Sequence, residues 1–284
     1  MFTLTAERPD GQRLTLTEYG SAYNVKYSGL GPVNADVITS SLGMVDGAKI
    51  NSARVDSRNI VLTVYISGSS VEAKRLHLYG FFTPKQAVKL YYKNGARDVY
   101  TEGIVETCEM DQFSAIQRAQ ISIICPQPYL IGAAEIVQDI TGVRSLFTFP
   151  FAIAAAGIEF SRLTAQDYAI LQNDGDVSAG FVASIFAVEN VVNPVIYNAI
   201  TGEAFRVSGT LEAGYTLTIG TITGAKKLTI TSPSGQVQNA LYRKKSGSVW
   251  LQLAPGSNYI SYAADSGEDT MLVTLRHNNL FVGV

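Results

Sequence analysis

The sequence predicts a mainly β protein with two domains and one helix, which lies in the first domain. Apolar and polar residues alternate with a period of two over most of the chain, as in strands that bury one face. Turn signals rich in Gly, Pro, Asn and Asp recur between these short runs. The 284 residues suffice for two domains of ordinary size.

The strands of the first half follow from this alternation. Residues 60–66 place Ile and Leu side chains on one face of an expected strand. Residues 87–92 and 97–105 flank the pair Asn94 and Gly95. Because Asn-Gly readily adopts the positive φ angles of a type I′ turn, these two runs are predicted to form a hairpin.

The helix is expected directly before residue 83. Ser69 and Glu72 have the spacing of a capping box, in which their side chains bond exposed N–H groups at the helix start. Leu76, Tyr79 and Phe82 form an apolar stripe that would lie on a sheet, and a Thr-Pro pair then ends the helix. The expected architecture of this half is a β-sandwich or barrel with one helix packed across it.

The domain boundaries are set by changes in composition. Prolines 126 and 128 stop strand pairing, so the first domain is expected to cover residues 1–130. Residues 131–157 are rich in Ala, Ile and Phe and are expected to be a packed connector. Residues 158–284 carry short alternating strands between closely spaced turns, which predicts a β-sandwich of jelly-roll or galectin type.

The composition excludes several classes of function. The net charge is −2 and neither half of the chain is basic, which argues against a protein that binds nucleic acid through its phosphates. The most apolar stretch, residues 146–158, contains Pro150 and is shorter than the ~20 residues of a membrane-spanning helix, so no membrane insertion is expected. Two cysteines and an N-terminus unlike a signal peptide predict a soluble protein made in a reducing cytoplasm.

The residues that usually carry chemistry are sparse and scattered. His77 and His277 are too far apart in sequence to form a local metal motif, and Cys108 and Cys125 lack metal-site spacing. No phosphate-binding loop, dinucleotide fingerprint or calcium loop occurs. We therefore expect no catalytic residue, no cofactor and no metal.

An enzyme remains the third hypothesis for function. Glu102 and Glu106 lie on the same face of an expected strand, as the paired carboxylates of a glycoside hydrolase could. Salt bridging is the more usual role of such residues.

The segment from Asn34 to Ile66 is the most informative about function. Asp46 and Gly47 mark the tip of a hairpin whose long arms are mostly polar. Such arms have too little apolar surface to fold alone, so they are expected to pair with another chain in a ring or tube. The candidate subunit-interface residues are Asp46, Gly47, Asn51, Arg54 and Arg58.

Aromatic residues of the second half suggest a docking surface. Trp250, the sole tryptophan, alternates with Val249 and Leu251 and so faces away from them. Because protein interfaces favour aromatic anchors, the candidate docking residues are Tyr242, Trp250 and Tyr259. An exposed Trp is also a weak indication of glycan contact, which leaves a carbohydrate-binding β-sandwich that contacts the host cell surface as the alternative function.

Several motifs occur together in one order along nearly the whole chain. They are Gly29-Leu30-Gly31-Pro32, Asp46-Gly47, Asn51-Ser52-Ala53-Arg54-Val55, Arg58-Asn59-Ile60, Cys125-Pro126-x-Pro128-Tyr129, Asn193-Pro194, Thr201-Gly202 and the closing Phe281-Val282-Gly283-Val284. In this combination the sequence resembles the distal tail proteins of siphophages.

The resemblance implies a structural protein of a phage or prophage tail, not an enzyme. The first domain would have the tail-tube fold with its long hairpin and form a homohexameric ring, and the second would be a galectin-like β-sandwich. The ring would join the tail tube protein to the tail-associated tip protein, with baseplate or receptor-binding proteins attached outside. DNA would pass through the channel without specific binding. The protein would be made in the bacterial host cytoplasm and located at the virion tail tip.

Overall fold

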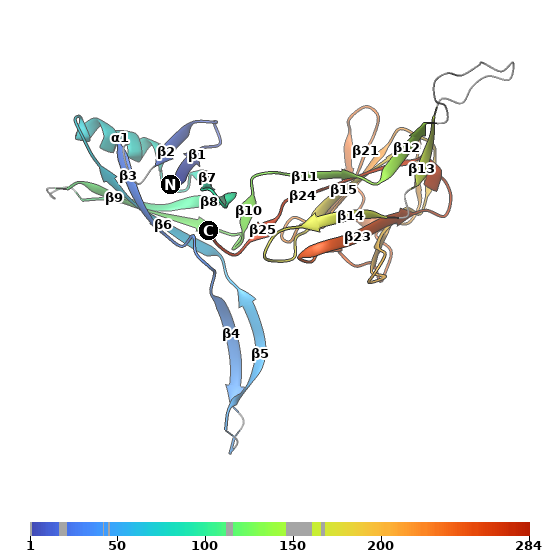
Figure 1. The fold of residues 1–284 in the computed structure, drawn as a ribbon, viewed down its shortest axis with the longest axis horizontal. Coiled ribbons are helices and arrows are strands. Elements are labelled where there is room, and N and C mark those ends of the chain that lie inside the picture. Colours follow the sequence, from blue (N-terminus) through green and yellow to red (C-terminus); the bar gives the residue numbers. More distant parts are fainter. Residues whose placement is uncertain are drawn as a thin grey trace. The chain divides into compact units, whose positions relative to one another are not determined.

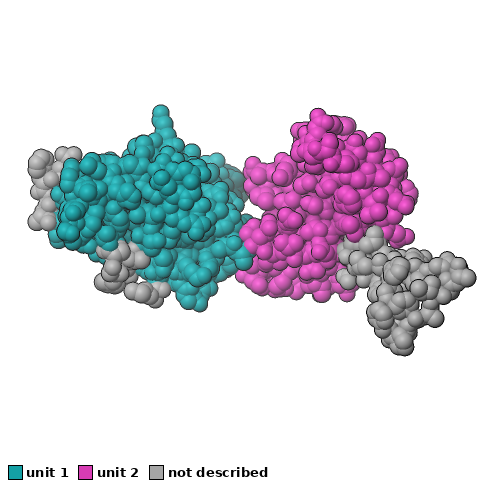
Figure 2. Space-filling model, turned by 90° about the horizontal axis from the view of Figure 1, so that it is seen from above, with its two compact units in different colours: residues 1–134, 280–284 teal, residues 135–279 magenta. Residues whose placement is uncertain are grey.

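The structure, a computed structural model, describes residues 2–16, 22–41, 43–44, 46–111, 116–145, 161–165 and 168–284. The chain divides into unit 1, which comprises Met1–Ala134 and Leu280–Val284, and unit 2, which comprises Glu135–Asn279 (Figure 1, Figure 2). Each unit has a hydrophobic core of its own. Strands dominate both units, which confirms the mainly β fold class.

Unit 1 is built on a nine-stranded antiparallel sheet. Its strands are β1 (Thr3–Glu7), β2 (Arg13–Leu16), β3 (Tyr23–Ser28), β6 (Arg58–Ile66), β7 (Ala87–Lys93), β8 (Asp98–Met110), β9 (Arg118–Cys125), β10 (Leu130–Gly132) and β25 (Leu280–Phe281). The main order is β2-β1-β7-β8-β9-β6-β3, and β10 pairs with both β8 and β25. The β4 (Ala35–Ser41) and β5 (Ala48–Val55) hairpin lies between β3 and β6 in the chain and forms a separate two-stranded sheet.

Alternation along these strands buries one face of the sheet. Leu62 and Val64 on β6 and Ile121 and Ile123 on β9 are fully buried. The helix α1 (Val71–Phe81) buries Leu78 and Phe81 in the same core. A single α-helix is present among the described residues, as expected.

The face of the helix and its cap differ from the sequence prediction. Leu76 is 57% exposed, so the predicted stripe is wrong. Of the predicted residues Phe82 is fully buried, and it shares the buried face with Leu78 and Phe81, because spacings of three and four residues track the 3.6-residue turn. The predicted capping box is also wrong: the helix begins after Ser70, which makes no side-chain cap.

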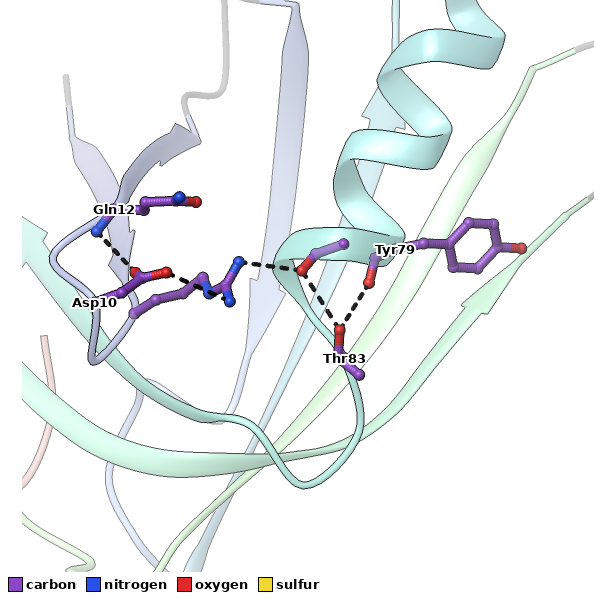
Figure 3. Close-up of polar contacts among 6 residues, drawn as sticks. Asp10, Gln12, Tyr79 and Thr83 are labelled. Atoms are coloured by element: carbon purple, nitrogen blue, oxygen red, sulfur yellow. Dashed lines mark hydrogen bonds and ion pairs between the residues drawn. The ribbon is translucent and has the colours of Figure 1, made fainter.

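The C-terminal end of α1 is tied to the turn between β1 and β2 (Figure 3). Arg8 Nη1 donates to the Gly80 carbonyl at 3.3 Å, and Arg8 Nη2 lies 3.5 Å from the Asp10 carboxylate. Thr83 Oγ1 donates to the Tyr79 carbonyl at 3.1 Å. These bonds satisfy carbonyls that the last helical turn leaves without an intrahelical partner.

The predicted β7–β8 hairpin is present, but its turn is of another kind. Lys93 pairs with Asp98, so the loop has four residues and not two. Asn94 Oδ1 accepts the backbone N–H groups of Ala96 and Arg97 at 2.9 and 2.6 Å. This side-chain bonding replaces the positive φ angles of a type I′ turn, which neither Asn94 nor Gly95 adopts.

Unit 2 contains two main sheets that share one core, the arrangement of a β-sandwich. The six-stranded sheet has the order β11 (Ile136–Asp139), β24 (Met271–His277), β15 (Phe181–Ala187), β20 (Thr216–Gly220), β21 (Lys227–Thr231), β22 (Val237–Asn239). The four-stranded sheet has the order β14 (Ala169–Asn173), β23 (Gly256–Ala263), β17 (Val195–Asn198), β18 (Ala204–Arg206). Phe181 and Val273 from the first sheet and Ile260 and Phe205 from the second meet in this core.

Smaller elements complete unit 2. Two further pairs of strands form two-stranded sheets, and there are two short 3-10 helices. These elements are β12 (Thr141–Ser145) with β13 (Ser161–Ala165), β16 (Val191–Val192) with β19 (Thr210–Leu211), η1 (Leu241–Arg243) and η2 (Glu268–Thr270).

The division between the units differs in detail from the expected boundaries of 130 and 158. The chain enters unit 2 after Ala134, and β11 already pairs with β24. Residues 146–157 of the expected connector lie outside the described residues. The last five residues, Leu280–Val284, leave unit 2 and return to unit 1, where β25 pairs with β10. Only tertiary pairing reveals this return, because the two paired segments lie far apart in the sequence.

Candidate functional site

The β4–β5 hairpin is the most exposed regular structure in unit 1. It extends away from the nine-stranded sheet (Figure 1). All seven residues of β4 are exposed, and so is β5 except for Val55. The register shifts between Ile38 and Thr39, which marks a bulge. A two-stranded ribbon is marginally stable by itself in water, so an additional partner would stabilise it.

Aliphatic side chains on the hairpin face solvent. The exposed fractions are 48% for Val37, 49% for Ile38 and 65% for Ile50, and Met44 near the tip is fully exposed. These residues are not among the predicted interface residues, because the arms were expected to be mostly polar. The signal was available, since β-branched aliphatic residues stand out in a stretch with so many Ser, Asn and Thr.

Most of the predicted interface residues lie on the exposed surface of this hairpin. Asp46 and Gly47 lie at its tip, where Gly47 has a φ of 101° that favours glycine. Ser40 Oγ donates to Asn51 Oδ1 at 3.3 Å across the ribbon. Arg54 is exposed and forms ion pairs with neighbouring carboxylates. These four residues are accessible to a neighbouring chain.

Arg58 does not belong with them, which corrects the sequence analysis. Its side chain is only 4% exposed, although only Asp56 and Ser57 separate it from the end of the hairpin. The guanidinium donates to four backbone carbonyls: Nε to Pro128 at 2.7 Å, Nη1 to Gly29 at 2.6 Å and Gly31 at 2.9 Å, and Nη2 to Val282 at 2.7 Å. Burial lowers the pKa of Arg58, and these four bonds offset the cost of burying its charge.

A polar cleft of about 410 Å³ lies beside the base of the hairpin. Its lining includes Asn34 before β4, Asp36 on β4, and Asp56 and Ser57 after β5. Arg54 Nε lies 3.6 Å from an Asp36 oxygen and 3.3 Å from an Asp56 oxygen, so the two acids share one cation. The cleft presents paired charges and backbone groups, and it contains no catalytic constellation.

The three predicted docking aromatics of unit 2 differ in their surroundings. Tyr242 is 80% exposed. Trp250 packs against Phe205 of the edge strand β18, with ring centroids 4.7 Å apart. Tyr259 packs against Tyr168, which precedes the opposite edge strand β14, with ring centroids 5.2 Å apart. The Tyr242 hydroxyl accepts a hydrogen bond from Arg243 Nε at 3.3 Å, and the other two aromatic rings pack against neighbouring rings.

The two glutamates of the enzyme hypothesis have structural partners. Glu102 lies 3.3 Å from Lys89 Nζ, and Glu106 accepts a hydrogen bond from Ser122 Oγ at 2.8 Å. Within the described part of the chain, no cluster of three or more His, Cys, Asp and Glu side chains is placed to hold a metal ion. Nor does any described helix have the length and apolar character needed to cross a membrane.

The cysteines have the surroundings of packing residues. Both thiols are free, and Cys125 is fully buried. Burial raises the pKa of Cys108 to about 11 and raises that of Cys125 as well. Raised thiol pKa values disfavour the reactive thiolate.

Comparison with known proteins identifies the domain that carries the hairpin. Residues 9–125, which include β2 through β9, match the family model of the phage tail protein RIFT-related domain. Over these residues unit 1 is similar to the phage tail RIFT-related domain. This match confirms the resemblance to phage tail proteins that the sequence motifs indicated.

Solved structures are similar to this chain over nearly its whole length. The Dit protein (gp 19.1) of SPP1, described as a paradigm of the hub adsorption apparatus in phages that infect Gram-positive bacteria, is similar with a TM-score of 0.67. The two are 14% identical, and the match covers 99% of each chain. A chain of the phage P2 baseplate in its activated conformation with Ca matches with a TM-score of 0.51 and 10% identity over 98% of each chain. The search of curated proteins found no match. At these low identities the likeness shows only that the fold of the chain, in both units, is similar to that of the SPP1 Dit protein.

Proposed function

We propose that this protein is the structural hub of a siphophage or prophage tail tip. Six copies close a ring that joins the tail tube protein to the tail-associated tip protein, and baseplate or receptor-binding proteins attach to it. The observation that carries the proposal is the match of both units, in one chain, to a phage hub protein over 99% of its length. The protein would be made in the bacterial host cytoplasm and located at the virion tail tip.

The mechanism is geometric and needs no catalysis. The hairpin exposes backbone edges on both of its strands, and such edges pair readily with another chain. Closing a ring removes these edges, because each copy supplies the same surface to the next one. Burial of the exposed aliphatic side chains of the hairpin would add the apolar contribution to this contact.

Passage of DNA requires a wall that does not bind phosphates tightly. We assign this role to the face of the unit 1 sheet that is opposite the core. Basic side chains there lie beside carboxylates in the pairs Arg13–Glu7, Lys89–Glu102, Lys93–Asp98 and Arg118–Asp111. Cations that are already paired release fewer counter-ions from DNA, which keeps binding weak.

The test is assembly of the full chain with its partners. The purified protein, alone and mixed with the tube and tip proteins of the same phage, is examined by sedimentation velocity and electron microscopy. The proposal predicts closed six-membered rings that sit between tube and tip. A protein that stays monomeric at high concentration even with both partners present would overturn it.

A glycan array distinguishes the alternative function. Trp250 packs against Phe205 and does not stand free as a sugar platform, so the hub proposal predicts no hit with bacterial cell-wall sugars. A hit that is lost on Trp250→Ala, in a variant that keeps its fold, would instead support a carbohydrate-binding β-sandwich.

A further inference from the structure

The five C-terminal residues make an unusual set of contacts within unit 1. Leu280 and Phe281 pair with β10. The Val284 N–H donates to the Leu30 carbonyl at 3.1 Å. Gly283 has no space for a side chain, since a Cβ there would lie 2.8 Å from the Gly31 carbonyl carbon. We call residues Leu280–Val284 the strap.

The strap contacts the loop that leads into the hairpin. Residues 29–34 connect β3 to β4, and both Leu30 and Gly31 touch the strap. The backbone of this loop also lies close to the start of β6, because a Cβ on Gly29 would fall 2.0 Å from the Asn59 carbonyl oxygen. Residues 29–34 are the incoming leg of the hairpin and residues 56–59 its outgoing leg, and both legs meet the strap or each other at this place.

Arg58 joins these three segments through one side chain. It lies in the outgoing leg as the first residue of β6, and its guanidinium bonds Gly29 and Gly31 of the incoming leg and Val282 of the strap. A planar guanidinium presents donors in fixed directions, which a lysine ammonium cannot reproduce. The direction in which the hairpin leaves unit 1 is thus set by bonds that include the end of the chain.

We propose that the strap is a lock on the hairpin. When seated, it holds both legs of the hairpin in one orientation; when withdrawn, it releases them. Only two residues separate the strap from β24, the last strand of unit 2, so a pull exerted on unit 2 by a bound protein would reach the strap through the chain. The biological consequence rests on the proposed function, since the lock would then couple proteins docked on unit 2 to the geometry of the ring.

A pair of matched glycine variants tests the lock. Gly283→Ala introduces a methyl group that must displace the strap or the Gly31–Pro32 backbone. Gly31→Ala is the control, because its Cβ would meet nothing within 4 Å and its φ is not positive. Spin labels are placed at Ser52→Cys on β5 and Thr3→Cys on β1, both exposed positions. The native thiols stay protonated at neutral pH, because burial raises the pKa of Cys108 to about 11 and Cys125 is buried.

The readout is the distribution of distances between the two labels in dilute protein. We expect one narrow distribution for the parent and for Gly31→Ala, and a broadened or shifted one for Gly283→Ala. An unchanged distribution for Gly283→Ala, or equal broadening in both variants, would overturn the lock. The measurement uses monomers, so its outcome is independent of ring formation, which sedimentation reports separately.

A second pair of variants keeps the proposal testable if Gly283→Ala does not fold. In Arg58→Lys the Val284 amide should exchange with solvent at least about tenfold faster, because a bond to a charged group is worth a factor of ten or more in equilibrium. The distance distribution should broaden as well. Arg54→Lys, at an exposed site beside the same hairpin, should change neither quantity. Faster Val284 exchange without any change in the distances would show that the strap is structural only, and would overturn the lock.

Discussion

Replacement of the hairpin's aliphatic side chains should weaken ring assembly without unfolding the subunit. The change is the triple substitution Val37→Ser, Ile38→Ser and Ile50→Ser. These side chains are about half exposed or more in the single chain, at 48%, 49% and 65%. Exposed positions away from special contacts usually change the free energy of unfolding by no more than about 0.5 kcal/mol each. The monomer should therefore keep its fold.

The expected loss of assembly follows from the same exposed fractions. Complete burial of a Val or Ile side chain contributes roughly 1.5–3 kcal/mol, so burying the exposed half contributes about 0.8–1.5 kcal/mol for each. Three such side chains give about 2.4–4.5 kcal/mol per subunit contact. That corresponds to a roughly 60- to 2,000-fold weaker association constant.

Sedimentation velocity over a concentration series measures this change. The triple variant should require a much higher concentration to form rings, while its thermal unfolding stays close to that of the parent. Ile200→Ser is the control, because Ile200 is 71% exposed in unit 2, outside the hairpin. Rings that form at the parent concentration in the triple variant would refute the assignment of the hairpin as the subunit contact.

Three further predictions concern stability and reactivity. Arg58→Met should lower the free energy of unfolding of unit 1 by roughly 3 kcal/mol or more, because four carbonyls lose a charged donor. The control Arg54→Met should lower it by less than about 1 kcal/mol, because Arg54 is exposed. Thermal unfolding followed by circular dichroism compares the two variants. Burial lowers the pKa of His277 below 6.5, partly opposed by Glu135, and neither ring nitrogen has a hydrogen-bond partner. The unfolded state therefore binds the proton more tightly, so the stability of unit 2 should be complete above pH 6.5 and fall as the pH drops through the lower folded-state pKa. His277→Gln should flatten this dependence in urea titrations between about pH 7.5 and 5, and equal pH profiles for both proteins would contradict the prediction. Both cysteines should resist iodoacetamide at about pH 8 in the folded protein and react in urea, since burial raises the pKa of both thiols. Mass spectrometry measures the labelling, and a cysteine labelled in the folded protein would contradict the prediction.

Local pattern was enough for the elements whose formation depends on near neighbours. Period-two alternation predicted strands in both halves, and a short run of helix formers before a Thr-Pro pair predicted the helix now seen at Val71–Phe81. The long exposed hairpin was also predictable, because its arms contain too few apolar residues to form a core. The pattern of individual hydrogen bonds was harder to predict. In the turn at Asn94, a side-chain acceptor replaces the backbone geometry that Asn-Gly usually adopts.

The role of Arg58 was decided by the tertiary structure alone. In the sequence it follows an exposed polar arm, and its charge favours a surface position. In the fold it is buried because the carbonyls of Gly29, Gly31, Pro128 and Val282 converge on it from three distant segments. Part of this convergence depends on β25, which follows unit 2 in the chain and pairs with β10 of unit 1. Periodicity is a local property, so the strands, the helix and the exposed arms could be predicted from the sequence. The contacts that close the base of the hairpin join segments that no local pattern relates, so only the folded chain shows which residues make them.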